Sequence, residues 1–239
     1  MERNLKVNFV FVILLAMLAP ARPAAQEHLR YKLVLSSTFG GPQSFFSGNI
    51  SNHGKAVGIA DTATPDPFYP NANPLIFTFA DPFVFHAFEW KNGVMVDLGA
   101  LPGANSSWAS FISESGLVSG QSINGAIDPL TGWPEEVAVL WKDGEIINLG
   151  TLGGYESGAG VVNSHGQIAG FSGNAVPDPY SLLGLGTQTR AFLWDKDHGM
   201  QDLGTLGGPD AFAPVINERG QITGFSYLNS APSPIVLSH

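Results

Sequence analysis

Short apolar stretches separated by turn-forming residues run through most of the chain. Two of these stretches end in tryptophan and are joined to the next apolar stretch by Lys91-Asn92-Gly93 and Lys142-Asp143-Gly144. Asn-Gly and Asp-Gly readily take the two positive φ angles of a type I′ turn, which connects antiparallel strands. The pattern therefore predicts β-hairpins at both positions.

The same order of residues recurs along the chain in three columns. The first column is a short segment ending in glycine, at residues 38–41, 100–103, 151–154 and 205–208. The second is a turn segment that is followed four residues later by another glycine, at residues 50–54, 112–116, 162–166 and 216–220. The third contains Trp90, Trp141 and Trp194, which are 51 and 53 residues apart. A period of about 50 to 60 residues indicates a repeat architecture.

Each copy contains four segments with the character of strands. One ends at the tryptophan, the next ends at Asp97, Asn148 or Asp202, and the last two flank the turn of the second column. In that turn a Ser or Asn side chain can accept a backbone hydrogen bond while the glycine takes the left-handed conformation. We predict an all-β, propeller-like fold of about four blades of four short antiparallel strands. The predicted repeat units are at about 31–85, 86–136, 137–189 and 190–239.

The two ends of the repeat region suggest how the ring closes. Residues 31–35 align with the second strand of a unit, so the first copy is expected to lack its own tryptophan strand, and residues 234–238 lie where the next such strand is due. Pairing of these two segments would remove two unpaired strand edges, which promote aggregation. The competing interpretation is an open half-ring that forms a homodimer through its free edges, or a piece of a longer protein.

The N-terminus has the layout of a secretory signal peptide. Arg3 and Lys6 precede an apolar run at residues 9–19, and small residues follow at 19–21 and 24–25. The run has about 11 residues, whereas a membrane-spanning helix needs roughly 20. We predict that residues 1–25 are removed, with an uncleaved anchor as the alternative. Residues 26–239 would then form a single domain outside the cytoplasm, secreted, extracellular or periplasmic, without membrane insertion.

Composition narrows the classes of function. The 29 glycines and 17 prolines argue against a helical bundle, while 44% hydrophobic residues suffice for a packed core. The formal charge of −9 argues against binding to nucleic acid or to an anionic membrane surface. The chain has no cysteine, which excludes disulfides, thiolate metal sites and cysteine catalysis.

The repeat motif also resembles a known family. His86-Ala87-Phe88-Glu89-Trp90, and the run from Arg190-Ala191-Phe192-Leu193-Trp194 to residues 202–208, are similar to the HAF-type extracellular repeat of bacterial secreted proteins. The similarity covers about residues 31–226, although the copy at residues 137–139 reads Val-Ala-Val. The resemblance implies an exported, propeller-like repeat protein, and it implies no catalytic residues.

The copies diverge most in the loops before each tryptophan strand, at about residues 61–85, 122–136 and 172–189. In a propeller, equivalent loops emerge on one face, and variable loops with exposed aromatic residues are typical of a binding surface. The candidate ligand-binding residues are Phe68, Tyr69, Trp133 and Tyr180. The alternative is that these loops are neutral insertions whose aromatic residues cover blade edges.

Other candidate sites have simpler structural interpretations. The three repeated tryptophans are expected to fill the core between blades. His53 and His165 occupy matching turn positions on different blades and are expected to be exposed rather than to bind a metal. Asp97, Asn148 and Asp202 are expected to cap strand ends, because an acid or base role would not tolerate the asparagine. We therefore predict no catalytic, cofactor-binding or metal-binding residues.

Three functions remain open on the sequence alone. The favoured one is a secreted, non-enzymatic propeller whose loop face binds an unknown extracellular ligand, either a glycan or a protein. The second is a structural component of a surface or matrix. The third is an extracellular polymer hydrolase or lyase, for which repeat equivalence offers only the carboxylates of Asp97 and Asp202.

Overall fold

The computed structural model describes residues 33–73, 80–103 and 106–228. The chain divides into two compact units, Met1–Leu35 and Ser36–His239. In the first unit only residues 33–35 are described, and they form no strand. The predicted signal peptide at residues 1–25 lies outside the described residues.

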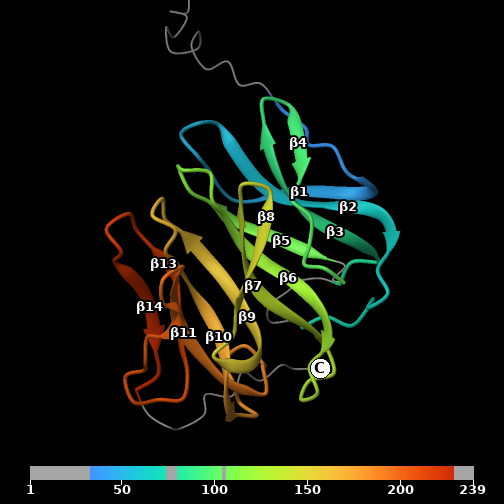
Figure 1. The fold of residues 1–239 in the computed structure, drawn as a ribbon. Coiled ribbons are helices and arrows are strands. Elements are labelled where there is room, and N and C mark those ends of the chain that lie inside the picture. The colour runs from blue at the N-terminus through green and yellow to red at the C-terminus, as the bar shows by residue number, and fades with distance from the viewer. Residues whose placement is uncertain (1–32, 74–79, 104–105, 229–239) are drawn as a thin grey trace, which may run out of the picture. The chain divides into compact units, whose positions relative to one another are not determined.

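Within the described residues the second unit is entirely β-structure, as predicted (Figure 1). Its strands form four antiparallel sheets, in each of which neighbouring strands follow one another along the chain. The first sheet contains β1 (Gly40–Ile50), β2 (Lys55–Pro65), β3 (Phe83–Lys91) and β4 (Val94–Asp97). The second contains β5 (Ser107–Ile112), β6 (Val118–Ile127), β7 (Pro134–Lys142) and β8 (Glu145–Gly150). The third contains β9 (Gly153–Val162), β10 (Ile168–Pro177), β11 (Thr187–Asp195) and β12 (Gly199–Asp202), and the fourth contains β13 (Ala211–Ile216) and β14 (Ile222–Ser226).

The predicted turn chemistry is confirmed. Asn92 and Asp143 have φ angles of 52° and 53°, and the glycines that follow them are also at positive φ, as a type I′ hairpin requires. In the turn between β9 and β10, Asn163 Oδ1 accepts hydrogen bonds from the backbone N–H groups of His165 (3.1 Å) and Gln167 (3.0 Å). Gly166 takes the left-handed conformation in that turn, at φ 82°. These local interactions place each hairpin where the sequence predicts it.

The hydrophobic core lies between successive sheets. Trp141 packs in a buried cluster with Val57 and Ala87 of the first sheet. Trp194 packs in a second cluster with Ala138 and Leu140 of the second sheet. The predicted role of these two tryptophans as core residues between sheets is thus confirmed, and each points towards the preceding sheet. Trp90 is half-buried and makes an edge-to-face contact with Phe46 at 6.0 Å between ring centroids.

The sheets do not have the boundaries of the predicted repeat units. Each of the first three sheets ends with the strand that follows a tryptophan, so the tryptophan strand pairs with the strand before it in the chain. The expectation that the first copy lacks its own tryptophan strand is therefore wrong, because β3 carries Trp90 in the first sheet. The expected strand at 31–35 is also wrong over residues 33–35, whereas residues 31–32 and 234–238 lie outside the described part of the chain.

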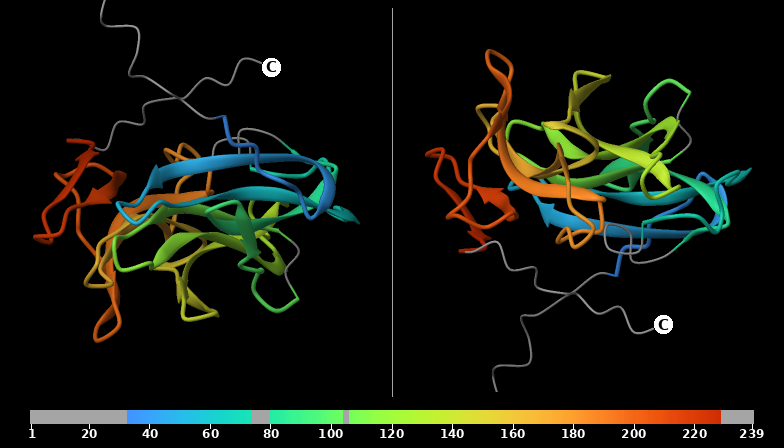
Figure 2. Two further views of the ribbon diagram at one scale, coloured as in Figure 1. Left: turned by 90° about the horizontal axis from the view of Figure 1, so that it is seen from above. Right: turned by 90° about the horizontal axis from the view of Figure 1, so that it is seen from below.

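The first strands of neighbouring sheets contact one another, β1 with β5, β5 with β9, and β9 with β13. The fourth sheet, red in Figure 2, lies beside the third in orange, where β13 contacts both β10 and β11. Among the described residues β14 has β13 as its one strand neighbour, whereas β2, β6 and β10 are each paired on both sides.

Candidate functional site

Three connections begin with the same local structure. They are residues 66–82 between β2 and β3, 128–133 between β6 and β7, and 178–186 between β10 and β11. Each starts with Asp-Pro, and the aspartate Oδ1 accepts a backbone hydrogen bond from the residue two positions ahead. The pairs are Asp66 with Phe68 (2.8 Å), Asp128 with Leu130 (2.7 Å) and Asp178 with Tyr180 (2.9 Å). This is an Asx turn, and it directs each chain away from its strand in the same manner.

The three connections meet at one end of the sheets. Asn73 Nδ2 donates a hydrogen bond to the Leu183 carbonyl oxygen at 3.2 Å, which joins the first connection to the third. Gly186 packs so closely on Leu130 that an added Cβ would lie 3.0 Å from the Leu130 Cβ, which joins the third to the second. We call this joined surface, formed by residues 66–73, 80–82, 128–133 and 178–186, the loop face.

The four predicted ligand-binding residues all lie on the loop face, in different environments. Tyr69 and Tyr180 are exposed, at 52% and 58%. Phe68 and Trp133 are half-buried. Phe68 and Tyr69 line a shared pocket, whose lining includes neither Trp133 nor Tyr180. The structure therefore brings only the first two of these residues together.

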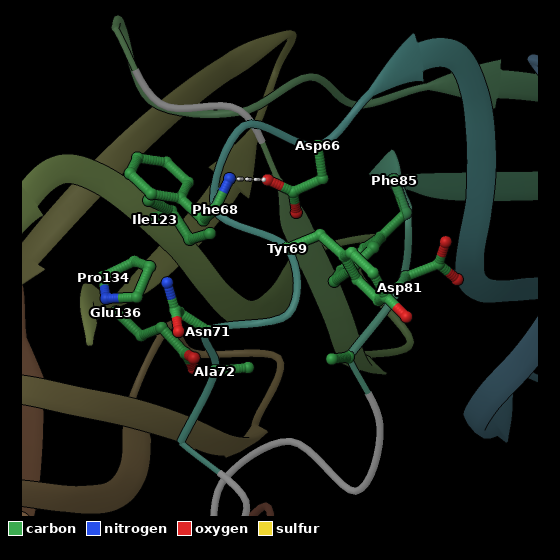
Figure 3. Close-up of a pocket in the computed structure, with 11 residues that line it drawn as sticks. Asp66, Phe68, Tyr69, Asn71, Ala72, Asp81, Phe85, Ile123, Pro134 and Glu136 are labelled. Carbon is green, nitrogen blue, oxygen red and sulfur yellow. Dashed lines mark hydrogen bonds between the residues drawn. The ribbon is translucent and has the colours of Figure 1, made fainter.

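The pocket lies where residues 66–72 and 80–81 cover the start of β7 (Figure 3). Its volume of about 20 Å³ is enough for roughly one water molecule. Three of its lining residues are carboxylic acids, Asp66, Asp81 and Glu136. Burial raises the pKa of Asp66. The hydrogen bond from the Phe68 N–H lowers this pKa in part, and the charge of Asp81 raises it. The pocket is thus a small acidic cavity beside aromatic rings.

Glu136 brings a buried carboxyl group to this pocket from β7. It is 2% exposed, and its Oε2 accepts a hydrogen bond from Gln121 Nε2 at 3.2 Å. Burial raises the pKa of Glu136 well above its ordinary value, and the Glu156 carboxyl raises it further. Glu136 therefore holds its proton at a higher pH than an exposed glutamate does.

Glu156, on β9 of the third sheet, is the second buried carboxyl group. It is 1% exposed, its Oε2 accepts a hydrogen bond from Asn73 Nδ2 at 3.2 Å, and its Oε1 has no hydrogen-bond partner. The pKa of Glu156 is raised to about 7, mainly by burial. The charges of Asp128 and Glu135 also raise this pKa, and the hydrogen bond from Asn73 lowers it. Asp128 Oδ2 is likewise buried without a partner. Unpartnered buried oxygens of this kind are costly, especially when charged.

Strand register shows that these two glutamates replace residues of other types. Glu136 stands opposite Ile123, at the position that Phe85 takes in the first sheet and Thr189 in the third. Glu156 stands at the position of Ser106 and Asp210, whose side chains accept the backbone N–H of Phe85 (3.3 Å) and Thr189 (2.7 Å). Sequence reasoning missed both glutamates. The available signal was the acidic residue at position 136, where a repeat copy has phenylalanine.

The other predicted roles can be checked directly. Asp97, Asn148 and Asp202 each accept the backbone N–H of the glycine two residues ahead, at 2.7, 2.8 and 2.7 Å, which confirms that they cap strand ends. His53 and His165 are exposed in their turns. In the described part of the chain, no group of three His, Asp or Glu side chains is arranged to hold a metal ion.

Comparison of the chain with protein-family models, with curated proteins and with solved structures found no match. None of residues 33–73, 80–103 and 106–228 belongs to a helix long and apolar enough to cross a membrane.

Proposed function

We propose that the protein is a secreted, non-enzymatic repeat protein whose loop face binds an extracellular glycan. The apolar run after Arg3 and Lys6 supports export, as does the resemblance to HAF-type bacterial repeats. A propeller-like arrangement of the sheets is supported by the four-stranded antiparallel order and by the contacts between the first strands of neighbouring sheets.

The observation that carries this proposal is the convergence of three variable connections on one surface. Asn73 bonds to Leu183, and Gly186 packs on Leu130, so residues far apart in sequence form one continuous face. Tyr69 and Tyr180 are more than half exposed on it. A tyrosine ring offers a flat apolar surface with a polar tip, which suits stacking against a sugar ring. The formal charge of −9 favours neutral or cationic glycans over anionic ones.

The test is a screen of the exported protein against a glycan array and purified envelope polymers. We expect binding to a neutral or amino-sugar glycan, weakened about tenfold or more by Tyr69→Ala or Tyr180→Ala. Val94→Ala is the matched control. Val94 is 63% exposed and begins β4, so it lies at the end of β3 that is farther from the loop face. The proposal would be overturned if the protein bound none of the glycans, or if Val94→Ala lost as much glycan binding as the tyrosine variants. Binding to a protein and to no glycan would replace the ligand class.

The second candidate function is an extracellular polymer hydrolase or lyase. One observation favours it, since Glu136 lines a pocket and its raised pKa is a property of general acids. The pocket volume of about 20 Å³ admits only a small group in this conformation. If this candidate is right, the purified protein releases new chain ends from a polysaccharide and Glu136→Gln abolishes the release.

A further inference from the structure

Residues 66–73 lead from the end of β2 to the third sheet, where the Asn73 side chain bonds to it. Asn73 is 1% exposed, and its amide group donates to Glu156 Oε2 and to the Leu183 carbonyl oxygen, both at 3.2 Å. Glu156 lies 83 residues further along the chain and Leu183 110 residues further. Asn73 therefore fixes the segment that carries Phe68 and Tyr69 to the third sheet and to the connection between β10 and β11.

The carboxyl group that receives Asn73 is poorly suited to carry a charge. One of its oxygens is buried without a hydrogen-bond partner. The charged groups that act on it from neighbouring elements are also acidic, Asp128 from the connection between β6 and β7, and Glu135 and Glu136 from β7. Ionisation of Glu156 under this cover thus places a negative charge in a dry, negatively charged environment.

We propose that Asn73 and Glu156 form a pH-dependent latch, which holds residues 66–73 on the third sheet while Glu156 is protonated and releases them when it ionises. The latch deepens the proposed function, on which its biological role rests, because it controls how Phe68 and Tyr69 are presented. Acidic surroundings would keep the pocket closed over Glu136, and neutral or alkaline surroundings would open it.

The direction follows from proton linkage. In the latched state the pKa of Glu156 is about 7, because burial outweighs the opposing effect of the Asn73 bond, while the ordinary value of 4.5 applies once water reaches the group. The open state thus binds the proton more weakly and gains population as pH rises between 4.5 and about 7. Because release of residues 66–73 lets water reach Glu156 and moves its pKa toward the ordinary value, the ratio of open to latched molecules rises from pH 5 to pH 8.

Hydrogen exchange of the peptide containing residues 66–73 tests the latch without any ligand. The amides of Tyr69 and Asn71 donate to the carbonyl oxygens of Asp66 (3.3 Å) and Phe68 (2.7 Å), so they report whether this segment is ordered. After correction for intrinsic exchange, we expect their protection in the wild-type protein to fall steeply from pH 5 to pH 8. Glu156→Gln should keep the protection at both pH values, since a neutral amide of the same shape cannot ionise. Asn73→Ala should lose protection at both.

A matched control distinguishes the latch from a general effect of buried acids. Asp210 occupies the equivalent position, immediately before β13, but its carboxylate accepts the N–H groups of Thr189 and Leu182. Asp210→Asn should therefore leave the pH dependence of residues 66–73 unchanged. Thermal melts at pH 5 show whether each variant is folded. Protection that does not change with pH in the wild-type protein, or that changes equally in Glu156→Gln, would overturn the latch. Neither result bears on whether the loop face binds a glycan, which the array measures separately.

Discussion

The interface between the first and second sheets and the interface between the second and third use the same strand positions but different chemistry. At the first interface Ile59 and Phe85 pack with Phe45 and Trp108, whose rings meet edge to face at 6.5 Å between centroids. At the second interface the positions equivalent to Ile59 and Phe85 are occupied by Gln121 and Glu136.

The partner strand of the second interface differs as well. β9 has Gly158 where β5 has Trp108, so close to Gln121 that an added Cβ would lie 3.0 Å from the Gln121 Cδ. The repeat scaffold thus has apolar side chains at these positions of the first interface and a half-buried glutamine and a buried glutamate at the second. Such a departure from the best local packing is expected where function or regulation requires it.

The largest effect is expected from the two tryptophans that lie in the apolar clusters between neighbouring sheets. Trp141→Ala and Trp194→Ala should each lower the free energy of unfolding by roughly 3 to 5 kcal/mol, because truncation of a large buried aromatic leaves a cavity. Urea titration measures the loss. A cost below about 1 kcal/mol for either variant would show that the tryptophans are not what joins neighbouring sheets.

Next in size is the pH dependence of stability at the polar interface. The folded-state pKa of Glu156 is about 7, above its ordinary value of 4.5, so its stabilising effect is complete below pH 4.5 and is lost as pH rises through about 7. The loss is at most about 3 kcal/mol in unfolding free energy, because release of residues 66–73 relieves part of it. Glu156→Gln should remove most of this decline in urea titrations between pH 5 and pH 8. An unchanged decline would assign it to other carboxyl groups.

Glu136→Gln sharpens the comparison further, because it keeps a hydrogen-bond acceptor for Gln121 while removing the ionisable group. At pH 8 it should raise the free energy of unfolding by about 1 to 2 kcal/mol, since it relieves the repulsion between two buried carboxyl groups. At pH 5 the variant and the parent should differ less in stability, because burial raises the pKa of both carboxyl groups and lower pH favours their neutral forms. Phe85→Gln is the contrasting variant at the apolar interface, and it should destabilise at both pH values.

The smallest effect on stability is expected on the exposed part of the loop face. Tyr69→Ala and Tyr180→Ala should change the free energy of unfolding by no more than about 0.5 kcal/mol, because both side chains are more than half exposed. The same urea titrations measure this change. Destabilisation as large as that of Trp141→Ala would mean that these residues belong to the core, and it would remove the proposed binding surface.

The sequence alone determined the elements that depend on neighbouring residues. Asn92-Gly93 and Asp143-Gly144 specify their hairpins because few other residue pairs take two positive φ angles, and Asn163 organises its turn with its own side chain. The positions of Trp141 and Trp194 in the core followed from alternation along a strand. The all-β class, the hairpins and the capping by Asp97, Asn148 and Asp202 were therefore predictable.

Only the tertiary structure decided which strands share a sheet and which carboxyl groups meet. A repeat has no intrinsic starting point, so the pattern could not show that a sheet ends after the tryptophan hairpin instead of beginning with it. Glu136 and Glu156 come from different sheets, and Asn73 reaches Glu156 across 83 residues. Local propensity carries no information on such contacts. They arise from the packing of one sheet on the next, and burial at that interface gives the two glutamates their raised pKa values.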